Sequence, residues 1–291
     1  MSTSGAAVSV ATRARRRGSK TFGTAERHWL LWPPLIFFAL LLVVPLVALF
    51  QQALTGQGNT FSEAVHMDVF AKAVERTLIL AAVVTVVTVI LGACYALAIA
   101  VGPVWIKVTL MAGLLISLWT SVMVRTFGWM LMELPTGALF WALDKLQLRS
   151  EPLNLYQTTP GMYPAMVAVM LPFAVLPVMA ALSSLDGEQV DAATIFGAGP
   201  LLVLRAVVLP ALRPALVSAG VLVFVMALGF YVTPLLLGGP SNMTLSGVIN
   251  AQLNNANRAD VGAAMSIILI GGTVVIYLIA DRLFKVSERW G

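Results

Sequence analysis

Residues 188–210 read EQVDAATIFGAGPLLVLRAVVLP and lie between two long apolar stretches of the chain. The first part predicts a short helix over residues 187–198, since alanines favour helix and carboxylates near a helix start suit its dipole. Glu188 and Asp191 are those carboxylates. The adjacent small pair Ala192-Ala193 leaves room for another surface to come close. The segment therefore predicts an ordered loop helix rather than a plain connection.

Glycine and proline divide this segment into two. Gly197 and then Gly199-Pro200 predict the end of the first helix, because Gly tolerates a left-handed φ and Pro cannot continue a helix. A second helix is expected over residues 201–208. We expect a bend at Leu209-Pro210, leading into the next apolar stretch. Gly197 would fix the angle between the two short helices.

The composition places the whole chain in a membrane. Of 291 residues, 59% are hydrophobic and 11% are charged, with a mean hydropathy of +0.91. A soluble domain carries roughly 25% charged residues. The lone cysteine, Cys94, lies in an apolar stretch and excludes an intrachain disulfide, so we expect it to pack in the core.

Six apolar stretches are each long enough, at roughly 20 residues, to span the hydrocarbon core as helices. A β-barrel would need alternating polarity, which these stretches lack. The sequence therefore predicts an all-α integral membrane protein with six transmembrane helices. The expected spans are residues 30–53, 77–101, 105–132, 161–185, 215–237 and 262–284.

Positive charges predict the orientation. With both termini in the cytoplasm, twelve of the 18 Lys and Arg residues lie inside and five outside. The basic cluster in residues 1–29 then reads as a disordered cytoplasmic tail beside a membrane span, not as a nucleic-acid-binding segment. The membrane domain covers residues 30–285, its cytoplasmic loop residues 186–212, and residues 286–291 form a cytoplasmic end.

The spacing in residues 188–210 resembles the EAA signature of permease subunits of ABC importers. That signature has an acidic residue, two alanines, a glycine and a final Leu-Pro at fixed spacing. The resemblance implies the transmembrane domain of a type I importer, whose loop docks on a separate ATPase. The residues it implicates in coupling are Glu188, Asp191, Ala192, Ala193, Gly197, Val207, Leu209 and Pro210. ATP and Mg would belong to that ATPase, because this chain has no phosphate-binding GxxxxGK[ST] motif.

Three further pieces narrow the resemblance: RTFGW at 125–129, PFAVLP at 172–177, and GFYVTPLLLGGP at 229–240. They are similar to the first, longer permease of spermidine/putrescine importers. One departure is ELPTG at 133–137, where that family more often has an apolar residue and a Gly/Asn-rich turn. The resemblance implies a second homologous permease, two ATPase subunits and a periplasmic solute-binding protein as partners. It also implies a bacterial inner membrane, no cofactor bound by this chain, and a polyamine as solute. Another amine, an opine, an amino acid or an organic acid is the alternative.

Some side chains in or near the spans are candidates for the solute path. Aromatic rings attract ammonium groups by ~0.5–2 kcal/mol, although ordinary packing is the competing interpretation. Arg125 is costly in lipid and should face protein or water, for packing or for solute. Glu133 would pair with a cationic solute or be a surface carboxylate. The full set is Trp119, Arg125, Phe127, Trp129, Glu133, Phe230 and Tyr231.

Two other functional classes fit less well. A secondary transporter places carboxylates or histidines at mid-membrane, and apart from Arg125 the span centres lack ionisable residues. A membrane enzyme needs a nucleophile with a base, or a cluster of metal ligands. The two histidines, His28 and His66, both lie outside the spans. The sequence therefore predicts a non-enzymatic permease.

Overall fold

The computed structural model describes residues 24–56, 59–148, 151–152, 154–254 and 258–284. The chain divides into two units, Met1–Ala48 and Leu49–Gly291. The predicted basic tail lies outside the described residues up to residue 23, and helix α1 (Thr24–Leu54) already includes its last residues. The predicted cytoplasmic end, residues 286–291, also lies outside them.

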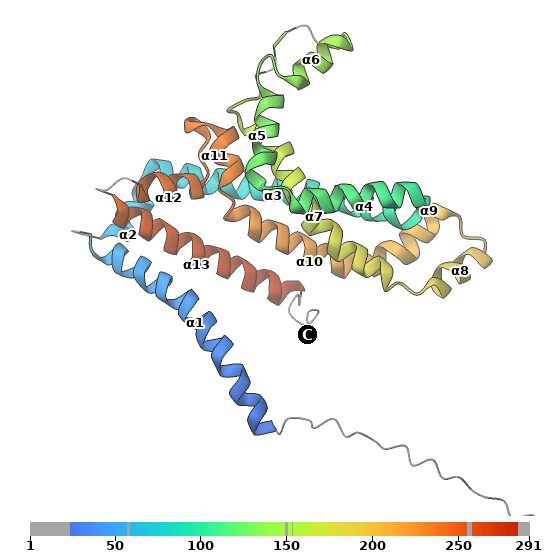
Figure 1. The fold of residues 1–291 in the computed structure, drawn as a ribbon, viewed down its shortest axis with the longest axis horizontal. Helices are drawn as coiled ribbons and strands as arrows, with labels where there is room; N and C mark the ends of the chain where they lie inside the picture. Colours follow the sequence, from blue (N-terminus) through green and yellow to red (C-terminus); the bar gives the residue numbers. More distant parts are fainter. Residues whose placement is uncertain (1–23, 57–58, 149–150, 153, 255–257, 285–291) are drawn as a thin grey trace, which may run out of the picture. The chain divides into compact units, whose positions relative to one another are not determined.

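The described residues are helical, with no strand among them (Figure 1). Five helical stretches are long and apolar enough to cross a membrane. They lie in α1, α3 (Asp68–Val101), α7 (Thr159–Ser183), α9 with α10 (Pro200–Leu228), and α13 (Ala259–Phe284). The predicted spans over residues 77–101, 161–185 and 262–284 therefore agree with α3, α7 and α13, although α3 already begins at Asp68.

The predicted span over residues 105–132 is a broken one. It consists of α4 (Val104–Trp119) and α5 (Val122–Glu133), which meet at 106°. The break lies at Thr120-Ser121, where the backbone is extended and the Thr120 hydroxyl donates to the Ile116 carbonyl at 2.7 Å. Hydroxyl side chains that bond to nearby backbone compete with helix in this way. Counted as one span, the pair brings the total to six.

The fifth span differs from the prediction of residues 215–237. Helix α10 (Leu209–Leu228) follows α9 (Pro200–Val203) and a π-helical turn, Leu204–Val208, without the expected bend at Leu209-Pro210. Pro210 lacks an N–H and its ring would crowd the carbonyl four residues earlier, and the wider π turn makes room for it. The span ends at Gly229, so the motif at 229–240 lies beyond it.

The remaining helices are short and lie between the spans. One end of the second unit carries α2 and α12, whereas α8 and α9 lie at the other end (Figure 1). Helix α12 was not predicted. The short helices are α2 (Thr60–His66), α6 (Ala138–Lys145), α8 (Gly187–Ile195), α11 (Val232–Gly238) and α12 (Leu245–Leu253).

Helices α3, α7 and α10 form the centre of the second unit. Leu80, Met166 and Val223, one from each of these helices, share a buried apolar cluster. A Cβ on Gly92 would stand 2.8 Å from the Ala174 side chain, so glycine allows α3 and α7 to approach closely here. The prediction that Cys94 packs in the core is wrong: Cys94 is exposed. Cys94 comes two positions after Gly92, so its side chain points to nearly the opposite face of α3, away from α7.

Candidate functional site

Helix α8 is an ordered structure with its own N-terminal cap. The Asp186 side chain accepts a hydrogen bond from the Glu188 backbone N–H at 3.0 Å. An aspartate at this position satisfies one of the free N–H groups of the first turn, which stabilises a helix by ~1 kcal/mol. Glu188 in the same turn adds a favourable charge. Residues of the segment itself therefore stabilise this helix.

Gly197 ends the helix in a left-handed conformation, with φ of +83°. The Ala198 N–H donates to the Ala193 carbonyl at 3.0 Å, and the Gly197 N–H donates to the Thr194 carbonyl at 2.9 Å. These two bonds form a Schellman motif, which commonly requires glycine at this point. Gly197 thus sets the direction in which the chain leaves α8 for α9.

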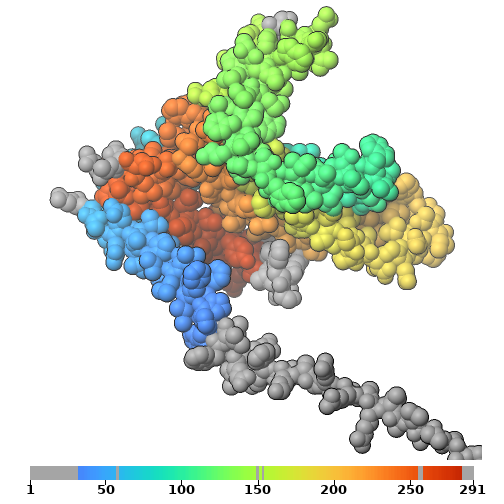
Figure 2. All heavy atoms as spheres, viewed as in Figure 1, coloured from blue at the N-terminus to red at the C-terminus, as the bar shows by residue number. Residues whose placement is uncertain are grey.

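The surface of α8 is uncovered. None of its residues is buried, and Ile195 and Phe196 at its C-terminal end are 83% and 90% exposed. Leu201 and Leu202 on the next turns are exposed too. The space-filling view shows this end with no other element over it (Figure 2). A contiguous exposed apolar surface of this kind marks an interaction site.

The predicted coupling residues all lie in this region. Asp191 and Ala192 are exposed on α8, Ala193 is half-buried there, and Glu188 is exposed near its start. Val207 is half-buried in the π turn, while Leu209 and Pro210 are exposed at the start of α10. Ile195 and Phe196 were not among the predicted site residues. A large apolar pair directly before a glycine, in a loop between spans, is the signal that could have identified them.

The predicted solute-path residues do not form one cluster. Trp119 is 84% exposed at the end of α4, and Phe127 is exposed on α5. Trp129 and Phe230 pack instead against the central apolar cluster. Tyr231 is half-buried before the start of α11.

The two ionisable residues in the predicted path set have separate surroundings. Arg125 donates from Nη1 to the Ser117 hydroxyl at 2.9 Å, across the break between α4 and α5. Its buried Nε has no hydrogen-bond partner among the described residues. Glu133 is buried at the end of α5, so it is not a surface carboxylate.

Two of the motifs that are distant in sequence meet in the structure. Thr126 of α5 and Thr233 of α11 are fully buried, and their hydroxyls lie 3.0 Å apart. The RTFGW and GFYVTP segments are therefore in contact, at the place where α5 of the broken span meets α11.

Polar contacts also hold α11 and α12 at their end of the unit. Arg76 of α3 donates to the Met243 carbonyl at 3.0 Å, and the Leu245 N–H donates to the Thr77 hydroxyl at 2.8 Å. Asn242 donates to the Gln157 carbonyl at 3.0 Å. This end of the unit is thus tied together by side chains, unlike the end that carries α8.

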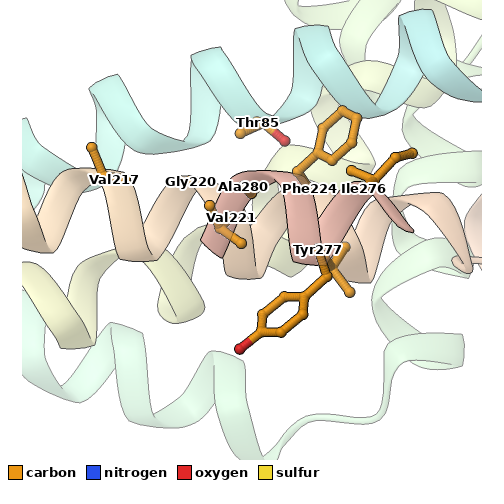
Figure 3. Close-up of a pocket in the computed structure, with 9 residues that line it drawn as sticks. Thr85, Val217, Gly220, Val221, Phe224, Ile276, Tyr277 and Ala280 are labelled. Carbon is orange, nitrogen blue, oxygen red and sulfur yellow. The ribbon is translucent and has the colours of Figure 1, made fainter. Parts of the chain in front are cut away.

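One cavity of about 290 Å³ lies between α3, α10 and α13 (Figure 3). Thr85, Phe224 and Ile276 line one side of it. The lining is otherwise apolar, and the Thr85 hydroxyl is buried without a hydrogen-bond partner among the described residues. The cavity offers no charged group to a polar solute. Within the described part of the chain, no group of His, Cys, Asp and Glu could hold a metal ion.

The fold is that of a multi-pass membrane protein with an exposed short helix, α8, between two of its spans. Residues 30–290 match the family described as binding-protein-dependent transport system inner membrane component. The chain belongs to this family, as an ABC importer permease of the inner membrane.

Similar proteins agree with this assignment. PotB, the spermidine/putrescine transport system permease protein of Salmonella typhimurium, is 29% identical over 218 residues, which cover 73% of this chain and 76% of PotB. Two crystal structures share the fold at 20% identity. A chain of a bacterial ABC transporter that imports the acidic polysaccharide alginate has a TM-score of 0.75, with 89% of this chain and 96% of that chain covered. A chain of the alginate transporter in complex with its alginate pentasaccharide-bound periplasmic protein has a TM-score of 0.72, covering 88% of this chain and 94% of that one. The fold is that of a type I importer transmembrane domain.

Proposed function

We propose that α8 and the start of α10 are the surface through which a cytoplasmic ATPase drives this permease. The observation that carries the proposal is the pair Ile195 and Phe196, exposed at the end of a capped helix that no part of the described chain covers. Asp191 on the same helix offers a carboxylate to a basic group on the partner. Large exposed side chains that enter a pocket on a partner supply most of the energy of such interfaces.

The complex we infer has two homologous permeases, two ATPase subunits and a periplasmic solute-binding protein. Both termini and the segment 186–212 would lie in the cytoplasm, where ATP is, as the Lys and Arg distribution predicts. ATP hydrolysis would belong to the ATPase subunits. Movement of α8 with its ATPase would rock α7 and α10, to which the loop is joined at its two ends.

For the solute we propose a polyamine. The similarity to PotB supports this choice, together with the motifs at 125–129 and 229–240. Another amine, an opine, an amino acid or an organic acid within the same importer class is the alternative, because the binding protein would set most of the selectivity.

The test is ATP-dependent uptake of labelled spermidine and putrescine into proteoliposomes that hold the full complex and its binding protein. Unlabelled amines, amino acids and opines serve as competitors. Saturable uptake that only polyamines block is the expected result. If another solute stimulates the ATPase and polyamines are not taken up, the coupling proposal stands and the polyamine assignment falls.

A further inference from the structure

The cavity of about 290 Å³ between α3, α10 and α13 is open on one side. None of its lining residues is buried, and Tyr277 of α13 is 40% exposed. Gly220 of α10 and Ala280 of α13 line it with at most a single methyl group. A Cβ on Gly220 would stand 3.8 Å from Val89 and 3.9 Å from Thr85, so there is room for a side chain at this position. Small residues on two helices therefore leave this space, the α10–α13 groove.

The α10–α13 groove suits an apolar ligand. Val221 and Phe224 of α10 and Ile276 of α13 line it (Figure 3), and no charged residue of the described chain does. Both helices belong to stretches long and apolar enough to cross a membrane, so we expect hydrocarbon around the middle of each. Apolar atoms beside an empty space lose dispersion contacts, so a ligand that fills the groove is favoured. In a bilayer, the acyl chains of lipids are the molecules available to fill it.

The length and the width of the groove fit one acyl chain. Its lining on α10 runs from Val217 to Val225, which is about 12 Å at the rise of a helix. One leaflet contributes about 15 Å of the hydrocarbon core, so a single chain is long enough to follow the groove. The volume of about 290 Å³ over that length gives a cross-section of about 24 Å². A helix, about 10 Å wide, has a cross-section of about 80 Å² and cannot enter.

A basic side chain lies at one end of the groove. Arg213 comes four residues before Val217 and seven before Gly220, so the three share one face of α10. Arg213 is exposed and lies about 6 Å along the helix from Val217, towards the end that carries α8 (Figure 1). It takes part in no ion pair with the described residues. A cation at this position can attract the phosphate of a lipid whose chain enters the groove.

We propose that the α10–α13 groove binds one acyl chain of an anionic glycerophospholipid from the leaflet on the α8 side, with Arg213 against its phosphate. Burial of the chain supplies most of the binding free energy, and the charge selects the headgroup. The lipid completes the packing between α10 and α13. This site is separate from the docking surface on α8 and does not depend on which solute is transported.

The test measures binding of labelled dioleoylphosphatidylglycerol to the purified, delipidated complex in detergent. Gly220→Leu places a branched side chain in the groove. Gly271→Leu is the matched control, because Gly271 of α13 also has open space around it and does not line the groove. We expect the dissociation constant to rise at least about tenfold in Gly220→Leu, since displacing about two methylenes suffices for that, and to stay unchanged in Gly271→Leu. Thermal unfolding shows whether each variant is folded.

The headgroup is tested with phosphatidylcholine that carries the same acyl chains. We expect the wild type to bind phosphatidylglycerol about fivefold more tightly, and Arg213→Gln to lose this preference. Lys107→Gln removes an exposed cation from α4, which does not line the groove, and should keep the preference.

Photolabelling locates the chain directly. A phosphatidylglycerol with a diazirine in one acyl chain is photolysed on the wild-type complex, and adducts are mapped by peptide mass spectrometry. Adducts on Val221, Phe224 or Tyr277 are expected.

Each result supports or overturns the site. Equal binding in the wild type and in a folded Gly220→Leu would overturn the groove as the place of binding. Equal affinity of the wild type for the two lipids would overturn the role of Arg213. If Gly220→Leu does not fold, the photolabel decides: adducts at the groove support the site. Adducts only elsewhere overturn it, which is the result expected if a protein helix covers the groove.

Discussion

The two ends of the second unit differ in the contacts that their side chains make. At the end with α8, Ile195 and Phe196 are exposed and the capping bonds stay within the loop. At the end with α11 and α12, Arg76 and Thr126 reach across to other elements. The contrast supports our proposal that another protein covers the first end, whereas contacts within this chain hold the second.

The largest effect is expected from changes on α8. Asp191→Lys reverses a charge on the docking surface, and Phe196→Asp replaces its most exposed large side chain. Both should lower ATP-driven uptake at least about thirtyfold, because loss of a central interface side chain costs ~2–4 kcal/mol. Membrane insertion and the unfolding temperature should not change, since both side chains are exposed among the described residues. Normal uptake in both variants would contradict a docking role for α8.

The corner of the loop should have the next largest effect. In Gly197→Ala the new residue must adopt φ of +83°, which costs roughly 1–2 kcal/mol. We expect uptake to fall several-fold while the solute is still bound. Gly187→Ala is the control, because Gly187 lies in α8 with open space around it and no positive φ. Equal uptake in the two variants would show that the angle at Gly197 is unimportant.

At the other end, Thr126→Val should lower stability by about 1–3 kcal/mol, because it leaves the buried Thr233 hydroxyl without its partner. Thermal unfolding of the purified complex measures this loss. The double change to valine at Thr126 and Thr233 should recover most of it, since removing both partners leaves no polar group unsatisfied. A double variant less stable than Thr126→Val would rule out the pairing as the cause.

The smallest effect is expected from Cys94→Ser. Cys94 is exposed on α3, so the change should alter the free energy of unfolding by less than about 0.5 kcal/mol. Thermal unfolding of the purified complex is the measurement. A loss of more than about 1 kcal/mol would mean that another subunit packs against this position.

The sequence predicts those parts of the fold that depend on local pattern. The helices α3, α7 and α13 follow from runs of apolar residues, and the shape of the loop follows from Asp186, Gly197 and Pro200 within a short segment. Spacing alone suffices there, because caps and turns are made by residues close in the chain.

The rest depends on packing between distant segments. Nothing in the hydropathy distinguishes Thr120-Ser121 as a break, because apolar residues continue on both sides. Glu133 looks like a surface residue at the end of a span, and its burial comes from Leu155 and Gly161, which the sequence does not connect with it. Helix α12 is short and has polar residues among its apolar ones, so its sequence alone does not predict a helix. Its helical conformation depends on packing against α13.

The most direct test of the central claim is cross-linking from α8. Cys94→Ser leaves the chain without cysteine, since Cys94 is its single one. A cysteine is then introduced by Phe196→Cys, and by Thr136→Cys as a control at an exposed position in the turn between α5 and α6. The full complex is treated with a short bifunctional thiol reagent, with an ATPase subunit that carries cysteines along its membrane-facing surface. We predict that Phe196→Cys joins the chain to the ATPase, with a yield that changes on addition of ATP, and that Thr136→Cys does not. If Phe196→Cys forms no cross-link to the ATPase in a complex that still takes up solute, the account is contradicted.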